Sequence, residues 1–81
     1  MTLFSQAIAF AAQVHSGAFR KGTDIPYIVH PMEAAAIAAT ITTDDAVLAA
    51  AVLHDVIEDC GVSAEELETR FGGVVAELVL S

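Results

Sequence analysis

The feature that most constrains this chain is an apolar run that passes directly into a cluster of histidine and carboxylate side chains. The run covers residues 46–53 and is followed at once by His54, Asp55, Glu58 and Asp59. A helix that is apolar on every side is buried on every side, so the cluster emerges from the core. Imidazoles and carboxylates that enter a low-dielectric interior need a partner that offsets their lost hydration, and a divalent cation meets that need.

His54 and Asp55 can form only part of a metal site. On a helix their side chains point about 100° apart, so both can reach the rim of one ion. Two protein ligands leave a metal under-coordinated, so another imidazole or carboxylate must come from elsewhere in the chain. His30 is the candidate, because it precedes Pro31 and proline favours the first turn of a helix. We expect Pro31 to begin that helix and His30 to lie just outside it.

The rest of the chain predicts an all-α fold of about five short helices. No segment has the period-2 alternation of a β-strand. The first helix is expected to start after Thr2 and to end at Gly17, and the central helix to carry the acidic cluster, with Thr43 as its N-cap. The remaining helices are expected over about 31–39, from Ser63 with a Ser63–Glu66 capping box to Gly72, and over 74–80.

Composition and charge limit the partners of the chain. The formal net charge of −8 argues against nucleic-acid polymers and anionic membranes. The 56% hydrophobic content and mean hydropathy of +0.64 exceed what a self-sufficient small domain needs, so we expect the surplus to be covered by further helices or in a homo-oligomer. One cysteine excludes an intramolecular disulfide. Without a secretory signal or membrane span, a reducing cytoplasm is expected.

Three ordered segments carry a family resemblance. They are His-Ser-Gly-Ala-Phe-Arg-Lys at 15–21, Pro-Tyr-Ile-Val-His-Pro at 26–31 and Leu-His-Asp-Val-Ile-Glu-Asp at 53–59, with Phe71-Gly72 further on. Together they resemble the HD-domain phosphohydrolases, specifically the RelA/SpoT-type branch that hydrolyses the alarmone (p)ppGpp. Three motifs in order are far more specific than a lone His-Asp pair. The resemblance implies an HD-domain-like helical bundle.

The resemblance also implies a mechanism, which is metal-assisted removal of the 3′-pyrophosphate of guanosine tetra- or pentaphosphate. His30, His54 and Asp55 would hold Mn²⁺ or another divalent transition metal. Glu58 and Asp59 would be the catalytic residues that orient water and move protons.

Substrate contacts are implied for the loop before the second motif. Arg20 and Lys21 would meet phosphate or the guanine face, and Tyr27 would help to shape that pocket. This loop gives a phosphate-bearing nucleotide a local landing site on an otherwise acidic protein.

One departure from the family bears on activity. The family's fourth metal ligand, an aspartate, lies downstream of Ser81, so residues 1–81 are expected to be a single, incomplete HD domain truncated at its C-terminus. We therefore expect this short chain to be weakly active or inactive. Two alternatives stay open: a non-catalytic, self-associating helical fragment, and an HD phosphohydrolase that acts on another nucleotide.

Overall fold

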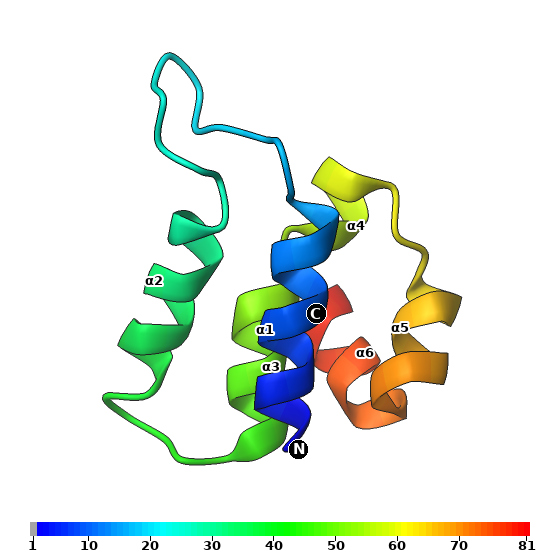
Figure 1. Cartoon of the computed structure of the whole chain (residues 1–81). Helices are drawn as coiled ribbons and strands as arrows, with labels where there is room; N and C mark the ends of the chain where they lie inside the picture. The colour runs from blue at the N-terminus through cyan, green and yellow to red at the C-terminus, as the bar shows by residue number, and fades with distance from the viewer. Residues whose placement is uncertain (1) are drawn as a thin grey trace.

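A computed structural model describes residues 2–81, which form six α-helices and no β-strand. In chain order the helices are α1 (Leu3–Val14), α2 (Val29–Ala38), α3 (Asp45–Leu53), α4 (Val56–Cys60), α5 (Ala64–Phe71) and α6 (Gly73–Leu80). A long loop between α1 and α2 projects from the bundle at the top of Figure 1. The all-α prediction is confirmed.

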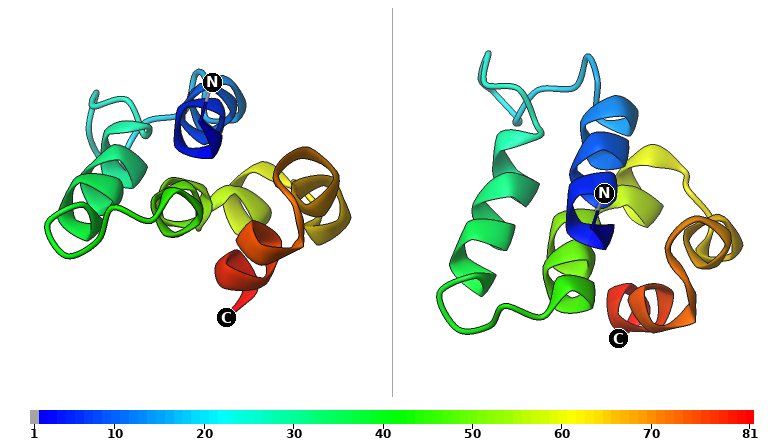
Figure 2. Two further views of the ribbon diagram at one scale, coloured as in Figure 1. Left: turned by 90° about the horizontal axis from the view of Figure 1, so that it is seen from below. Right: turned by 60° about the horizontal axis from the view of Figure 1, so that its bottom comes forward.

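Helix α3 is the centre of the bundle. It packs against α1, α2 and α6, which surround it in the view from below in Figure 2. Ala49, Ala50, Val52 and Leu53 are all buried. The alanines let neighbouring helices approach closely, whereas Val52 and Leu53 fill the space between them. The prediction that the apolar run is buried on every side is only partly right, because Val47 is 36% exposed and Ala46, Leu48 and Ala51 are half-buried.

The C-terminal helices close the core beside α1. The rings of Phe10 and Phe71 meet edge to face with their centroids 5.6 Å apart. The hydroxyl of Ser63 caps α5 by accepting a hydrogen bond of 3.1 Å from Glu66 N. The other half of the predicted capping box is replaced, because the Glu66 carboxylate accepts a hydrogen bond from Arg70 Nε at 2.8 Å.

The prediction of one continuous central helix through the acidic cluster is wrong. Helix α3 ends at Leu53 and α4 begins at Val56, with His54 and Asp55 as the residues between them. Asp55 has φ −96° and ψ −5°, the bridge region of backbone space that active-site residues often occupy. Because of this break, α4, which carries Glu58 and Asp59, runs in a different direction from α3.

The start of α3 differs from the expected capping by one residue. Asp44, not Thr43, is the N-cap, and its carboxylate accepts hydrogen bonds from the backbone N–H groups of Ala46 and Val47. Asp44 has an extended backbone conformation immediately before the helix, which points its short side chain at those donors.

Asp45 has a separate, long-range role. Its two carboxylate oxygens accept hydrogen bonds of 2.9 Å from the backbone N–H groups of Leu3 and Phe4, at the start of α1. These donors have no partner within their own helix, and an anion there is also favoured by the helix dipole. One side chain therefore ties the N-termini of α1 and α3 together.

Replacing Asp45 by alanine should lower the free energy of unfolding by about 1–3 kcal/mol, because two hydrogen bonds to a charged group are lost. Urea denaturation followed by circular dichroism measures the change. Asp24→Ala, which removes the same charge from an exposed loop position, is the matched control and should leave stability nearly unchanged. Equal losses in the two variants would contradict the capping role.

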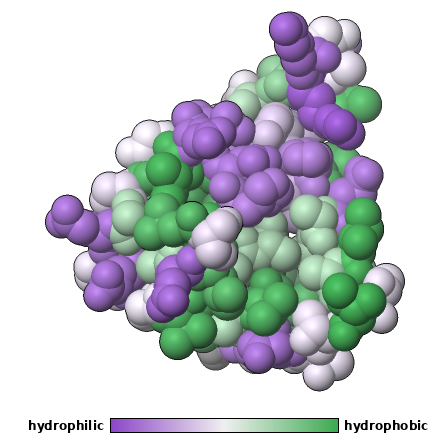
Figure 3. Space-filling view, turned by 180° about the vertical axis from the view of Figure 1, so that it is seen from behind, coloured by the Kyte–Doolittle hydropathy of each residue, from purple (hydrophilic) through white to green (hydrophobic). Residues whose placement is uncertain are grey.

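The surface retains exposed apolar side chains. Ile37 on α2 is 67% exposed and Val74 on α6 is 66% exposed, and Figure 3 shows hydrophobic groups over much of the rear face. Within residues 2–81 no helix is both long enough and apolar enough to cross a membrane. The expected homo-oligomer stays a prediction.

Candidate metal centre

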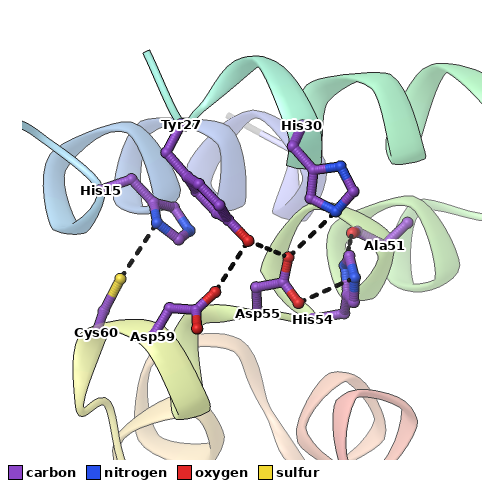
Figure 4. Close-up of polar contacts among 8 residues, drawn as sticks. All are labelled: His15, Tyr27, His30, Ala51, His54, Asp55, Asp59 and Cys60. Atoms are coloured by element: carbon purple, nitrogen blue, oxygen red, sulfur yellow. Dashed lines mark hydrogen bonds and ion pairs between the residues drawn. The ribbon is translucent and has the colours of Figure 1, made fainter. Parts of the chain in front are cut away.

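Three side chains from three helix ends converge in Figure 4. His30 lies in the first turn of α2, His54 is the C-cap of α3 and Asp55 is the N-cap of α4. Asp55 Oδ2 is 3.4 Å from His30 Nε2, and Asp55 Oδ1 is 3.1 Å from His54 Nε2. One nitrogen or oxygen atom from each residue lies within 4.8 Å of the others. The structure therefore brings together all three predicted metal ligands.

The hydrogen bond between His54 Nδ1 and the Ala51 carbonyl determines the tautomer of His54. It leaves the lone pair of the other ring nitrogen, Nε2, facing Asp55. His54 Nδ1 is 3.0 Å from the carbonyl oxygen of Ala51, and a carbonyl can only accept, so Nδ1 must carry a proton. In the neutral ring Nε2 then has no proton. Its lone pair faces the carboxylate of Asp55, and two such acceptors at 3.1 Å require a proton or a cation between them.

The spacing of these atoms suits a shared divalent cation. Two ligands that each bind at about 2.1 Å, with an angle of about 90–110° at the ion, lie about 3.0–3.4 Å apart. The distances from His30 Nε2 to Asp55 Oδ2, 3.4 Å, and from His54 Nε2 to Asp55 Oδ1, 3.1 Å, lie in this range, so both carboxylate oxygens would face the ion. Two imidazoles and one carboxylate are also a donor set that divalent transition metals accept. The residues present fit a metal centre that needs further ligands from water, substrate or protein.

His30 reaches the cluster from inside α2, which corrects the prediction that it lies before the helix. Helix α2 begins at Val29, so Pro31 occupies its first turn. Proline is tolerated there because the first N–H groups of a helix have no partner within the helix. His30 is held at this position by a backbone hydrogen bond of 3.0 Å from its N–H to the Tyr27 carbonyl.

A tyrosine joins the metal cluster to the acidic pair. The Tyr27 hydroxyl oxygen is 2.9 Å from Asp55 Oδ2 and 2.9 Å from Asp59 Oδ2. Burial, followed by these hydrogen bonds and the carboxylate charges, raises the pKa of Tyr27 far above its ordinary value. The phenol is therefore a donor at any physiological pH. Glu58 is exposed one residue before Asp59 on α4.

A buried histidine lies on the other side of Tyr27. His15 is 3% exposed, its Nδ1 is 3.3 Å from Cys60 Sγ, and its ring centroid is 4.8 Å from that of Tyr27. Burial lowers the pKa of His15, although the charges of Asp59 and Asp55 oppose the shift. Burial and the same charges raise the pKa of the Cys60 thiol. Both groups are therefore mainly neutral at pH 7, in keeping with a structural role.

Sequence reasoning missed this His15–Tyr27 contact, because its partners are 12 positions apart and meet only after the loop folds back. The loop is held by an isolated β-bridge between Phe19 and Pro26 and by the hydrogen bond from Tyr27 N to the Ala18 carbonyl at 2.9 Å. Tyr27 returns to the bundle through these contacts.

The predicted substrate-binding residues separate into two places. Tyr27 lies at the cluster, whereas Arg20 and Lys21 are exposed on the projecting loop and are not among the contacts drawn in Figure 4. Their predicted contact with phosphate depends on a ligand that would bridge the loop and the cluster.

Comparison with known proteins fits this geometry. A family model described as HD domain matches residues 7–81. The chain belongs to the HD-domain family. HD domains bind divalent metals, and the His30, His54 and Asp55 cluster provides suitable ligands in this one.

Individual relatives point to one branch of the family. The chain is 47% identical over 74 residues to the guanosine-3′,5′-bis(diphosphate) 3′-pyrophosphohydrolase of Vibrio cholerae. This alignment covers 91% of this chain and 10% of the relative. It is 40% identical over 79 residues to a GTP pyrophosphokinase of Myxococcus xanthus, covering 98% of this chain and 10% of the relative. This chain thus spans about a tenth of the length of these relatives.

A solved structure supports the same fold. It is described as a metazoan ortholog of SpoT that hydrolyzes ppGpp, and it aligns with a TM-score of 0.90 at 36% identity. The alignment covers 99% of this chain and 47% of that structure. The prediction of an HD-domain-like bundle is confirmed.

The cluster should bind divalent manganese weakly, with His54→Ala and Asp55→Ala each reducing affinity by at least about 10-fold. Isothermal titration calorimetry with MnCl₂ on the 81-residue chain measures this. Asp24→Ala, which removes the same charge from the exposed loop, should bind like the unmodified chain. Identical titrations for all four proteins would show that the cluster is not the binding site.

Proposed function

We propose that this HD domain takes part in the metal-dependent removal of the 3′-pyrophosphate from guanosine tetra- or pentaphosphate. The observation that supports it most is the convergence of His30, His54 and Asp55 directly before the helix that carries Glu58 and Asp59. This arrangement pairs a metal centre with proton-handling carboxylates, and the 47% identical relative is named for that reaction.

The proposed reaction is hydrolysis at phosphorus. The oxygen of a water molecule forms a bond to the phosphorus next to the ribose, and the bond from that phosphorus to the 3′ oxygen breaks. The products are GDP or GTP and pyrophosphate. When bound, the divalent ion supplies Lewis acidity and makes water a stronger acid. Glu58 and Asp59 orient the water, accept its proton and return a proton to the 3′ oxygen.

Binding of the polyphosphate falls to the loop and the metal centre together. The acidic surface, with a formal net charge of −8, would repel a tetra- or pentaphosphate unless local positive charge offsets it. Arg20 and Lys21 provide two of the three basic residues of the chain and are exposed side by side. We propose that they contact phosphate or guanine while Tyr27 shapes the inner wall of the pocket.

The finer assignments also belong to this proposal. We propose Mn²⁺ as the ion, a cytoplasmic location and residues 1–81 as one part of an HD domain. The relatives are about ten times longer than the matched region, so segments outside it are available to supply a further ligand.

The names of the relatives keep another role open for this segment. The Myxococcus relative is named for pyrophosphate transfer to GTP, not for hydrolysis. In such a protein the HD domain could be non-catalytic, or a related nucleotide could be the substrate. The intact His and Asp ligand set favours the hydrolytic role, because a non-catalytic module has no need of it.

The hydrolase proposal is tested by a chimera in which this chain replaces the matching residues of the Vibrio cholerae relative. We expect the chimera to release pyrophosphate from ppGpp with Mn²⁺, whereas the isolated 81-residue chain should have little or no activity. Misplacement of reacting groups by about 1 Å can cost on the order of 100-fold in rate, so an incomplete site is a poor catalyst.

Two substitutions in the chimera assign the roles. Glu58→Gln should reduce turnover by at least about 100-fold while leaving manganese affinity largely intact, because its role is proton transfer and not ligation. Glu68→Gln, which makes the same change at an exposed position on α5, is the matched control and should leave turnover unchanged. An inactive chimera that still binds manganese, or one active only on dGTP, would move the function away from ppGpp.

We also propose that the exposed apolar surface drives self-association. Exposed apolar residues on α2 and the turn after it, and on α6, are Val29, Met32, Ile37, Ile41, Val74, Leu78 and Leu80. Light scattering of the 81-residue chain at tens of micromolar should report dimers or larger species. Val74→Lys together with Leu78→Lys should shift the population toward monomer. A well-folded monomer without these substitutions contradicts the proposal.

A further inference from the structure

The orientation of Asp55 depends on a donor outside its own helix. Asp55 is the N-cap of α4, a position where an aspartate usually accepts hydrogen bonds from the first backbone N–H groups of the helix. Here its side chain makes no such cap hydrogen bond. The carboxylate is turned instead toward Tyr27, His30 and His54. Something other than local helix capping must hold it there.

Of these three neighbours, Tyr27 makes the shortest contact with Asp55, whereas His30 Nε2 lies further from the same oxygen, at 3.4 Å. His54 Nε2 presents a lone pair in the neutral ring, since Nδ1 donates to Ala51. The phenol of Tyr27 has a hydrogen to donate, and its oxygen is 2.9 Å from Asp55 Oδ2. The Tyr27 hydroxyl is therefore the contact that orients Asp55 before any metal binds.

The ring that carries this hydroxyl is itself held on both sides. Its centroid lies 4.8 Å from the buried ring of His15 and 5.8 Å from that of His30. The backbone of Tyr27 is held as well, because its N–H donates to the Ala18 carbonyl and its carbonyl accepts a hydrogen bond from His30 N. The hydroxyl is thus aimed at the carboxylates by a fixed ring, as Figure 4 shows.

The same hydroxyl also reaches Asp59. Asp55 and Asp59 are four positions apart, at opposite ends of one helical turn where like charges repel. Tyr27 Oη lies 2.9 Å from both Oδ2 atoms and has only one hydrogen to donate. The two carboxylates therefore share or compete for that hydrogen, so a change at one of them alters the hydrogen bond to the other.

We propose that Tyr27 is a positioning residue, whose hydroxyl fixes Asp55 for metal binding and sets the place of Asp59 relative to it. The inference rests on the proposed metal centre and extends it to a residue whose sequence-based role was substrate contact. Partners that orient a metal ligand typically change metal affinity by about 10–100-fold when they are removed.

The test is Tyr27→Phe in the 81-residue chain, which keeps the ring and removes only the hydroxyl. Its manganese dissociation constant should rise by about 10-fold or more in calorimetry. Circular dichroism should report an unchanged helical content. Thr69→Val, which removes a hydroxyl that bonds Glu65 O on α5, is the matched control and should leave affinity unchanged.

A second measurement needs no metal. Three-bond NMR couplings in the metal-free chain should report one χ1 rotamer for Asp55, and rotamer averaging in Tyr27→Phe. Unchanged couplings, or an unchanged affinity in a variant that still binds manganese, overturn the positioning role. If even the unmodified chain binds no manganese, the proposed metal centre fails, and the couplings alone then decide whether Tyr27 orients Asp55.

Discussion

The burial of α3 and of the first residue of α4 is the constraint on which the site depends. Leu53 and Val56 are fully buried immediately before and after the His54-Asp55 pair. Each such side chain contributes about 1.5–3 kcal/mol when it is removed from water. The two anchors hold the backbone on both sides of the pair, so the interhelical turn is fixed at the edge of the core while its polar side chains face outward.

This placement leaves the side chains of the two ligands partly exposed while buried residues flank them on both sides. The side chain of His54 is 45% exposed and that of Asp55 is 21% exposed, whereas their backbones join buried residues. A metal site needs this combination, because an ion must enter from solvent and its ligands must keep their geometry. Alanines in α3 contribute by letting α1 and α2 lie close enough for His30 and Tyr27 to reach the same point.

The site contains more hydrogen-bond acceptors than hydrogens to donate to them. Tyr27 supplies one hydrogen to two carboxylates, and His54 directs its remaining lone pair at one of them. Excess acceptors of this kind favour a cation at the centre of the cluster. His15 is buried and its ring packs against that of Tyr27. Burial also lowers the pKa of His15, which disfavours a positive charge there. The cation that the site favours would also attract an anionic substrate to an acidic protein.

The sequence by itself determined the helical class, the burial of the second half of the apolar run, from Ala49 to Leu53, and the identity of the three candidate ligands, because these follow from local periodicity and from residue types in order. It could not determine the break at His54 and Asp55, since the residues themselves are compatible with a continuous helix. Nor could it find the contact of Tyr27 with both carboxylates. That contact joins positions 28 and 32 residues apart, and only the tertiary structure decides where a folded-back loop delivers a side chain.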